Sequence, residues 1–377
     1  MNKKMNKILI ILTLIWILVT SCDRYNPVND DMQKIPDFEN LAAEASLKAL
    51  QDNLGQNSDA AEPNFQMALY RIRKKEDSLA IPFLEKSLQI DSTKSKYFLA
   101  LSRVYANMGK TEKALDVLNK SKGLGEKSLE SLILGGELYY IAKEYNEAIK
   151  SLNEALQISK RDARIYFWKA NVEIARLDSA NALKNLSLAL KYKPNYYEVF
   201  NSYAQLFSKY ESYNAAIYYV NLGLKINANN DALNFTKAEA FRLKKFADDS
   251  AFIYYKKVYS VNPKIWQASY FLGKYSFERG QGAEAQKYFL SSLKYKDFSN
   301  SRYYLGMSYY YSNQKEKAIK ELLKATKLDS QNLAANEWYW KVRSEIEAEK
   351  QYRYQDSLQK QYYKSLQLQQ QIIPVPK

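Results

Sequence analysis

One residue type recurs at an almost constant interval along most of this chain. Alanine stands at positions separated by steps of 34, 34, 34, 34, 35, 34 and 33 residues. The positions are Ala80, Ala114, Ala148, Ala182, Ala216, Ala251, Ala285 and Ala318. A period of this length is typical of a two-helix unit that cannot bury its apolar face alone and has to stack on its neighbours. The period therefore predicts an all-α solenoid, which is usually a surface for binding rather than a site of chemistry.

Two further columns keep a fixed distance from these alanines. Four residues after each alanine the chain has Leu84, Leu118, Leu152, Leu186, Val220, Tyr255, Phe289 and Leu322. Twelve residues before most of them it has Ala68, Ser102, Gly136, Ala170, Ala204, Ala238, Gly273 and Gly306. Two antiparallel helices can cross closely only where side chains are small, so the columns predict one small position on each helix of a pair. Large residues beside the crossing would be Tyr105, Tyr139, Phe207, Phe241 and Tyr309.

The one-residue changes in the period, and most of the glycines and prolines that end helices, fall where loops between these helices are expected. The one extra residue is expected in a turn at 246–249, and the missing one near 296–300, because loops tolerate changes of length. Gly109 and Gly280 are predicted to end helices within repeats, and Pro194 and Pro263 to separate successive repeats. Pro82 is expected in the first turn of a helix, where proline is tolerated.

The last unit carries two motifs in the order found in the tetratricopeptide repeat (TPR) family. They are Leu305-Gly306-x-x-Tyr309 and Ala318-x-x-x-Leu322-x-x-Ala325. The resemblance covers about residues 61 to 331. It implies a right-handed superhelical solenoid of about eight TPR helix pairs. Glu173 departs from the family pattern, because an aromatic residue is usual there.

The N-terminus has the pattern of an export signal. Three lysines precede an apolar run from 8 to 19, which is of signal-peptide length and short for a membrane span. The run ends in Val19-Thr20-Ser21-Cys22, which is similar to a bacterial lipobox, and Cys22 is the only cysteine. The resemblance implies that Cys22 becomes the acylated first residue of a mature lipoprotein. The alternative is an uncleaved signal anchor with an incidental cysteine.

These features predict the domain organisation of the chain. Residues 1–21 are the lipoprotein signal peptide and 22–36 a flexible tether. An N-terminal helix at 37–60 precedes the TPR solenoid at 61–331. A capping helix at 332–370 and a disordered tail at 371–377 complete the chain. The expected location is the bacterial cell envelope, with the outer membrane favoured over the inner one.

The C-terminal segment is expected to form a helix that covers the end of the solenoid and continues with apolar residues at regular steps. Asn332 is expected to cap a helix whose first turns cover the last apolar face of the solenoid. The residues that provide this cover are Trp338, Trp340, Val342 and Ile346. Further along, apolar residues from Tyr354 to Leu366 recur at steps of four, which is not a heptad and disfavours a simple coiled coil.

Composition argues against several other classes of function. Removal of the signal peptide lowers the formal net charge from +15 to +12, but lysines are spread through the repeats, so nucleic acid is not expected as a partner. The chain has no histidine, which removes the commonest general base and metal ligand. It also lacks a phosphate-binding glycine loop and a nucleophile elbow, and Asp248-Asp249 are expected to be solvated charges in a turn. We therefore predict a protein that is not an enzyme and that has neither cofactor nor metal.

The TPR resemblance implies that the first helix of each pair lines the concave face. Inward positions include Arg103, Glu137, Phe167, Asn171, Asn201 and Gln205. A second group near the end consists of Tyr270, Lys274, Phe277, Tyr303, Tyr310 and Tyr311. The candidate partner-binding residues are this second group together with Asn171 and Arg103. Their aromatic rings suit an extended peptide or a helix, and the alternative is that these tyrosines pack between repeats.

The predicted function is a membrane-anchored scaffold or adaptor in the bacterial envelope, whose partners are envelope proteins or extended peptides. A carboxylate clamp for chaperone tails is not supported, because Phe167 with Asn171, followed by Ser202, does not match it. The alternative function is an accessory lipoprotein that binds a glycan or small ligand for a nutrient-uptake system. The oligomeric state stays open.

Overall fold

The computed structural model describes residues 47–125, 127–244 and 248–372. Regular structure within these segments is helical throughout. The signal peptide, Cys22, the tether and the first part of the N-terminal helix lie outside the described residues, as does 373–377.

The chain divides into two compact units, Met1–Lys110 and Thr111–Lys377. The described helices of the first unit are α2 (Leu47–Gln56), α3 (Ala61–Arg73), α4 (Asp77–Ile90) and α5 (Ser95–Asn107). The second unit begins with α6 (Thr111–Gly123), α7 (Leu129–Ile141), α8 (Tyr145–Ile158), α9 (Ala163–Ala175), α10 (Ser179–Tyr192), α11 (Tyr197–Lys209) and α12 (Tyr213–Ile226). It continues with α13 (Asp231–Leu243), α14 (Asp248–Val261), α15 (Trp266–Glu278), α16 (Gly282–Leu293), α17 (Ser299–Tyr311), α18 (Lys315–Leu328) and α19 (Leu333–Ile372).

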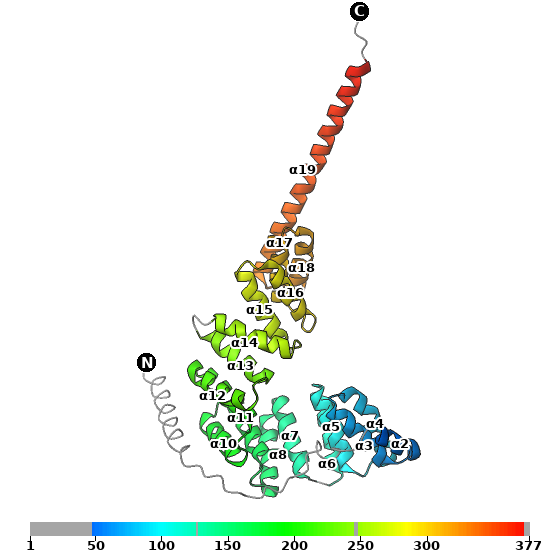
Figure 1. Cartoon of the computed structure of the whole chain (residues 1–377), viewed down its shortest axis with the longest axis vertical. Helices are drawn as coiled ribbons and strands as arrows, with labels where there is room; N and C mark the ends of the chain where they lie inside the picture. The colour runs from blue at the N-terminus through cyan, green and yellow to red at the C-terminus, as the bar shows by residue number, and fades with distance from the viewer. Residues whose placement is uncertain (1–46, 126, 245–247, 373–377) are drawn as a thin grey trace, which may run out of the picture. The chain divides into compact units, whose positions relative to one another are not determined.

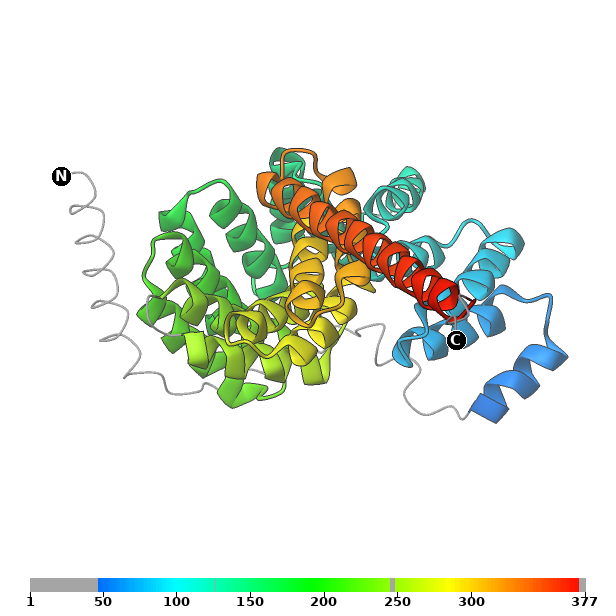
Figure 2. The same cartoon turned by 90° about the horizontal axis from the view of Figure 1, so that it is seen from above.

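Within each compact unit, consecutive helices pack as antiparallel pairs, and neighbouring pairs pack on one another (Figure 1). In the second unit the pairs α7/α8, α9/α10, α11/α12, α13/α14, α15/α16 and α17/α18 follow one another in this way. Figure 2 shows that α9 to α15 follow a curved path. First helices also touch first helices of the next pair, as α7 does with α9 and α11 with α13. The predicted all-α solenoid of about eight helix pairs is confirmed.

The crossing points of the pairs lie at the predicted small residues. Every alanine of the 34-residue column is buried, as is every member of the large column four residues later. The glycines show how close the helices come. An ideal Cβ on Gly136 would stand 2.4 Å from Leu152 Cγ, and one on Gly273 would stand 2.8 Å from Phe289 Cδ1. The small column on the first helix therefore receives the large column of the second helix.

The turn between the two helices of a repeat has a left-handed residue at a fixed position. Gly109 and Gly280 occupy it with φ of 73° and 72°, as predicted for helix-ending glycines. The same position in other repeats is held by Lys75, Lys143, Leu177, Glu211 and Asn313, all with positive φ. Because L-residues tolerate this region poorly, the helix pairing imposes the turn geometry whatever residue stands there.

Two local expectations were wrong. Asp248 and Asp249 begin α14 instead of lying in a turn, which places both carboxylates at the positive end of the helix. Asp249 is exposed to solvent, as expected, and it pairs with Arg279 at 2.6 Å and accepts a hydrogen bond from the Tyr275 hydroxyl. Pro82 is the sixth residue of α4, beyond its first turn, so it removes one internal hydrogen bond of that helix.

Glu173, the departure from the family pattern, lies among polar side chains of α8, α9 and α10. Its Oε2 accepts a hydrogen bond from Asn185 Nδ2 at 2.7 Å. Burial raises the pKa of the Glu173 carboxyl, and burial lowers the pKa of Lys169 one turn earlier on α9. Lys169 Nζ in turn donates to Asn153 Oδ1 at 2.8 Å. Polar pairing thus replaces the usual aromatic packing.

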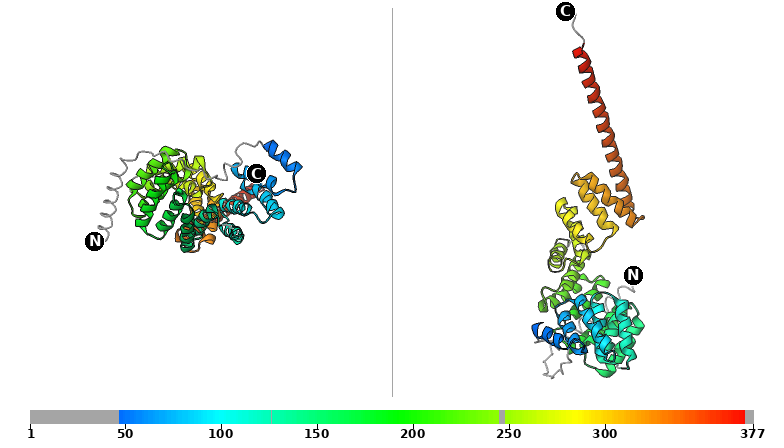
Figure 3. Two further views of the ribbon diagram at one scale, coloured as in Figure 1. Left: turned by 90° about the horizontal axis from the view of Figure 1, so that it is seen from below. Right: turned by 90° about the vertical axis from the view of Figure 1, so that its right-hand side faces the viewer.

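The C-terminal helix α19 has two different parts. Asn332 Oδ1 accepts from the Ala335 backbone N–H at 3.1 Å, so Asn332 caps α19 as predicted. Val342 and Ile346 are buried against Ala318 and Leu322 of α18, which closes the apolar end of the solenoid. Beyond these turns α19 extends away from the other helices of its unit (Figure 1 and Figure 3), and its tyrosines from Tyr352 onward are exposed.

The crossing contact predicts a specific sensitivity to one added methyl group. Gly136→Ala should lower the free energy of unfolding by about 1–3 kcal/mol, because the new Cβ overlaps Leu152. The matched control is Gly123→Ala at the end of α6, where a Cβ would meet nothing within 4 Å outside its own helix. That variant should stay within about 0.5 kcal/mol of the parent. Urea denaturation followed by circular dichroism measures both, and equal stabilities for the two variants would contradict the crossing model.

Candidate functional site

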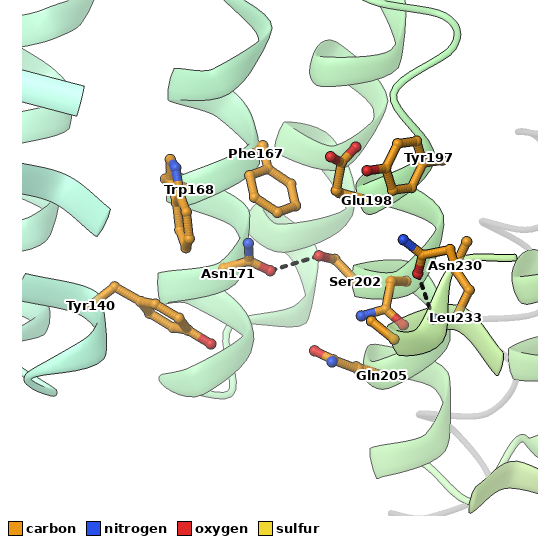
Figure 4. A pocket seen from close by; sticks show the side chains of 12 residues that line it. Tyr140, Phe167, Trp168, Asn171, Tyr197, Glu198, Ser202, Gln205, Asn230 and Leu233 are labelled. Carbon is orange, nitrogen blue, oxygen red and sulfur yellow. Dashed lines mark hydrogen bonds between the residues drawn. The ribbon is translucent and has the colours of Figure 1, made fainter. Parts of the chain in front are cut away.

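Four consecutive first helices of the second unit form a pocket of about 270 Å³ (Figure 4). Its lining comes from α7, α9, α11 and the beginning of α13. The residues are Tyr140, Phe167, Trp168, Asn171, Tyr197, Glu198, Asn201, Ser202, Gln205, Asn230, Ala232 and Leu233. Helical spacing explains the contributions of α9 and α11, because residues three and four apart share one face of a helix.

Hydroxyl groups from the following repeat fix the amides inside this pocket. Ser202 Oγ donates to Asn171 Oδ1 at 2.7 Å, and Thr236 Oγ1 donates to Asn201 Oδ1 at 2.6 Å. Figure 4 shows the Asn171 carbonyl oxygen turned to Ser202 and its amide nitrogen turned away from it. Among the described residues, neither amide nitrogen has a hydrogen-bond partner. The pocket therefore presents two oriented N–H donors that can bind carbonyl oxygens of a ligand.

Aromatic rings form a second part of the pocket wall. The Trp168 ring lies 5.7 Å from that of Tyr140 and 5.0 Å from that of Phe167, between ring centroids. Phe167 also packs against the buried ring of Tyr196. Burial raises the pKa of the Tyr140 hydroxyl, and burial together with the nearby Glu198 raises the pKa of the Tyr197 hydroxyl. Both phenols are thus neutral donors at physiological pH.

Neither metal chemistry nor membrane crossing is visible in the described part of the chain. Within residues 47–125, 127–244 and 248–372, no group of three or more acidic, histidine or cysteine side chains could hold a metal ion. None of the helices found there is both long and apolar enough to cross a membrane.

Comparisons with known proteins agree with the helix-pair architecture. The family model for tetratricopeptide repeats matches residues 300–332, and that for anaphase-promoting complex, cyclosome, subunit 3 matches residues 74–155. The chain thus has repeats of the TPR type, which these models match over residues 74–155 and 300–332. No significantly similar sequence is found among the curated proteins.

Two solved TPR-like structures show the same fold at low sequence identity. The APC/C hetero-tetramer Cut9–Hcn1 gives a TM-score of 0.55 at 11% identity over 78% of this chain. Yeast Tom70 gives a TM-score of 0.56 at 14% identity over 71% of this chain. The matches span only 58% of each of those two chains. At these identities the likeness concerns the fold alone.

The TPR pocket contains some of the residues that the sequence singles out as inward-facing. Asn171, Phe167, Asn201 and Gln205 all line it, whereas Glu137 on α7 does not. The candidate Arg103 lies on α5 in the first unit.

Several pocket residues are not found by the 34-residue columns. These are Tyr140, Trp168, Tyr197, Glu198, Asn230, Ala232 and Leu233. Glu198 could have been found by helical spacing, because it precedes Asn201 by three residues on α11. Asn230 lies just before α13, where its side chain caps the helix, so no helical pattern indicates it.

The C-terminal aromatic group of the TPR solenoid takes part mostly in packing between repeats. Tyr270 on α15 lies with its ring 5.1 Å from that of Phe298, and burial raises its pKa to about 12. Phe277 packs with its ring 5.6 Å from that of Tyr304, and Lys274 pairs with Glu278 of its own helix at 3.6 Å.

The α17 members of this group contact the capping helix α19. Tyr303 and Tyr310 pack on the cluster around Val342, and the Tyr310 hydroxyl donates to Glu345 at 2.9 Å. That hydrogen bond raises the pKa of Tyr310. Tyr311 differs from both, because 66% of its surface is exposed. The assignment of the group as a binding site stays a prediction.

Stability measurements separate the packing from the binding contribution of this group. Tyr270→Ala should lower the free energy of unfolding by about 2–4 kcal/mol, because it opens a cavity among packed rings. Tyr311→Ala should change it by less than about 0.5 kcal/mol, because the ring is exposed. Chemical denaturation of both variants gives the comparison, and an equally mild effect of Tyr270→Ala would show that its ring is free to bind a partner.

Proposed function

We propose that this protein is a scaffold that holds an extended segment of a partner protein across α7, α9, α11 and α13. The observation that carries the proposal is the pair of oriented amides of Asn171 and Asn201 on adjacent first helices. Main-chain carbonyls of an extended segment are acceptors available in any sequence. Recognition by side-chain amides therefore fits a peptide that runs across the helices.

The volume of the pocket and the span of the four helices favour a peptide segment over a small molecule as the ligand. The volume of about 270 Å³ lies below the roughly 300–1,000 Å³ typical of small-molecule sites. Helix axes that pack side by side are about 8–10 Å apart, so four first helices extend over roughly 25–30 Å. An extended segment advances about 3.3 Å per residue, and about eight residues would cross that distance. The pocket would then hold one side chain of the segment while the rest lies across neighbouring repeats.

We further propose that an acyl chain on Cys22 holds this scaffold at a membrane of the bacterial envelope, with the outer membrane favoured. The support is the charged and apolar stretch that ends in the only cysteine of the chain. The acidic and proline-containing segment 22–36 would act as a spacer between the membrane and the repeats. Envelope proteins are accordingly the expected partners.

The alternative function, binding of a glycan for nutrient uptake, has one observation in its favour. The pocket combines the Trp168 ring with amides of Asn171, Asn201 and Gln205, and such groups can stack on and hydrogen-bond a sugar. If the pocket binds a glycan, the glycan should stabilise the purified protein in the absence of any protein partner. If the protein is a scaffold for peptide segments, added glycan should leave its stability unchanged.

Filling the pocket should abolish capture of the partner. Ala232 is exposed at the pocket wall, and Ala232→Trp should block it without disturbing the core. Ala180→Trp, at an exposed position of α10 outside the pocket lining, is the matched control. In crosslinking from native membranes, the parent and the control should capture the same envelope protein, with crosslinks that map to one extended segment beside Gln205. Equal capture by Ala232→Trp would contradict the proposed location.

The lipid anchor has its own test. Metabolic labelling with an alkyne palmitate analogue should mark the parent protein and place it in the membrane fraction. Cys22→Ala should lose the label, because no second thiol exists in the chain. Cys22→Ser serves as a near-isosteric companion. A parent protein that stays unlabelled but membrane-bound would instead support an uncleaved signal anchor.

A further inference from the structure

A ladder of charges runs through the first helices at the same 34-residue period as the core columns. Successive positions are Glu62, Lys96, Glu130, Arg164, Glu198 and Ala232. The acidic and basic residues alternate until the last position, where alanine replaces the expected base. The first compact unit contains one complete pair, and the second contains another.

The two complete pairs show what this ladder does. Lys96 Nζ lies 2.7 Å from Glu62 Oε2. Arg164 makes a two-pronged contact, in which Nη1 and Nη2 donate to the two carboxylate oxygens of Glu130 at 2.8 Å each. Asp162 also contacts Arg164 at 2.7 Å, so its guanidinium is shared between two acids. Each pair joins the first helices of neighbouring repeats.

The third acid of the ladder lacks such a partner. Glu198 lies where the next pair would begin, but Ala232 on α13 offers no charge. Among the described residues, no lysine or arginine forms an ion pair with Glu198. Glu198 and Ala232 both line the pocket, and every other lining residue is uncharged. The pocket thus has one acidic side chain, which contacts the Tyr197 hydroxyl but no base among the described residues, in a chain whose net charge is +15.

The aromatic wall adds a second feature that favours a cation. Figure 4 shows Phe167, Tyr197 and Glu198 on the same side of the pocket, opposite Tyr140 and Gln205. Lysine and arginine side chains lie over aromatic rings at several other places in this protein, for example Lys237 over Tyr254 at 4.2 Å. In the described part of the chain, no basic side chain lies over Phe167, Trp168 or Tyr140. These rings are therefore available to a cation from a ligand.

We propose that the pocket takes a lysine or arginine side chain of the bound peptide segment, which pairs with Glu198 and completes the ladder. In the two complete pairs, the first helix of the next repeat provides the base, Lys96 or Arg164. Position 232 is alanine, so here the ligand provides the positive charge that faces Glu198. The amides of Asn171 and Asn201 hold main-chain carbonyls near this side chain. The inference rests on the proposed peptide-binding function and specifies its ligand.

Selection from a display library of random nine-residue peptides tests the inference on the full-length protein. The parent protein should enrich peptides with lysine or arginine at one fixed position. Glu198→Gln keeps the shape of the side chain and removes its charge, so it should lose that enrichment. The control is Glu316→Gln, which removes an exposed acid of α18 and should select the same peptides as the parent. A thermal denaturation curve for each variant confirms that it is folded.

One selected peptide then gives the quantitative comparison. Replacement of its basic residue by norleucine should weaken binding to the parent at least tenfold in fluorescence anisotropy, and should leave binding to Glu198→Gln unchanged. A consensus without a basic residue, or an undiminished preference in Glu198→Gln, would overturn the ligand assignment while peptide binding stands. If no peptide is enriched by the folded parent protein, the proposed function fails and the assignment fails with it.

Discussion

The structure depends on one repeated contact, the close crossing of two helices at small residues. At Gly136 the partner side chain Leu152 comes so near that a single added carbon would overlap it. Such a crossing buries only one face of each pair, so the other face has to be covered by the next repeat. This dependence extends along the solenoid and ends only where α19 covers the last pair with Val342 and Ile346. The 34-residue period is the sequence expression of this contact.

The sequence predicts this core well because each contact repeats. A side chain that must be small in one repeat must be small in all, and eight aligned examples make the requirement visible. The same reasoning could have found a further buried column, which includes Ser87, Ser121 and Gly223. An ideal Cβ on Gly223 would stand 2.9 Å from Leu233 Cδ1 of the following repeat. Local features that occur once are harder to predict. The helix start at Asp248 and the position of Pro82 inside α4 depend on where one particular helix begins.

The pocket was predictable only in part, for a related reason. The inward face follows from the period, and Phe167, Asn171, Asn201 and Gln205 were found on it. The charge of the pocket depends instead on a position where the repeated pattern is interrupted. Glu198 matters because Ala232 stands where the series of alternating charges would have a base. The absence of a base there becomes informative only once Glu62–Lys96 and Glu130–Arg164 are known to form ion pairs. The distances between neighbouring first helices supply that knowledge, and the sequence does not.

Asn171 shows how one residue can serve both the core and the binding face of a solenoid. Only 8% of its surface is exposed, so an unsatisfied carbonyl there would be costly. Ser202 from the next repeat satisfies it and at the same time determines which way the amide points. The hydrogen bond that stabilises the contact between repeats therefore also orients the donor that faces a ligand. Because the same bond performs both tasks, the binding surface is ordered before the ligand arrives, and the entropy lost on binding is correspondingly smaller.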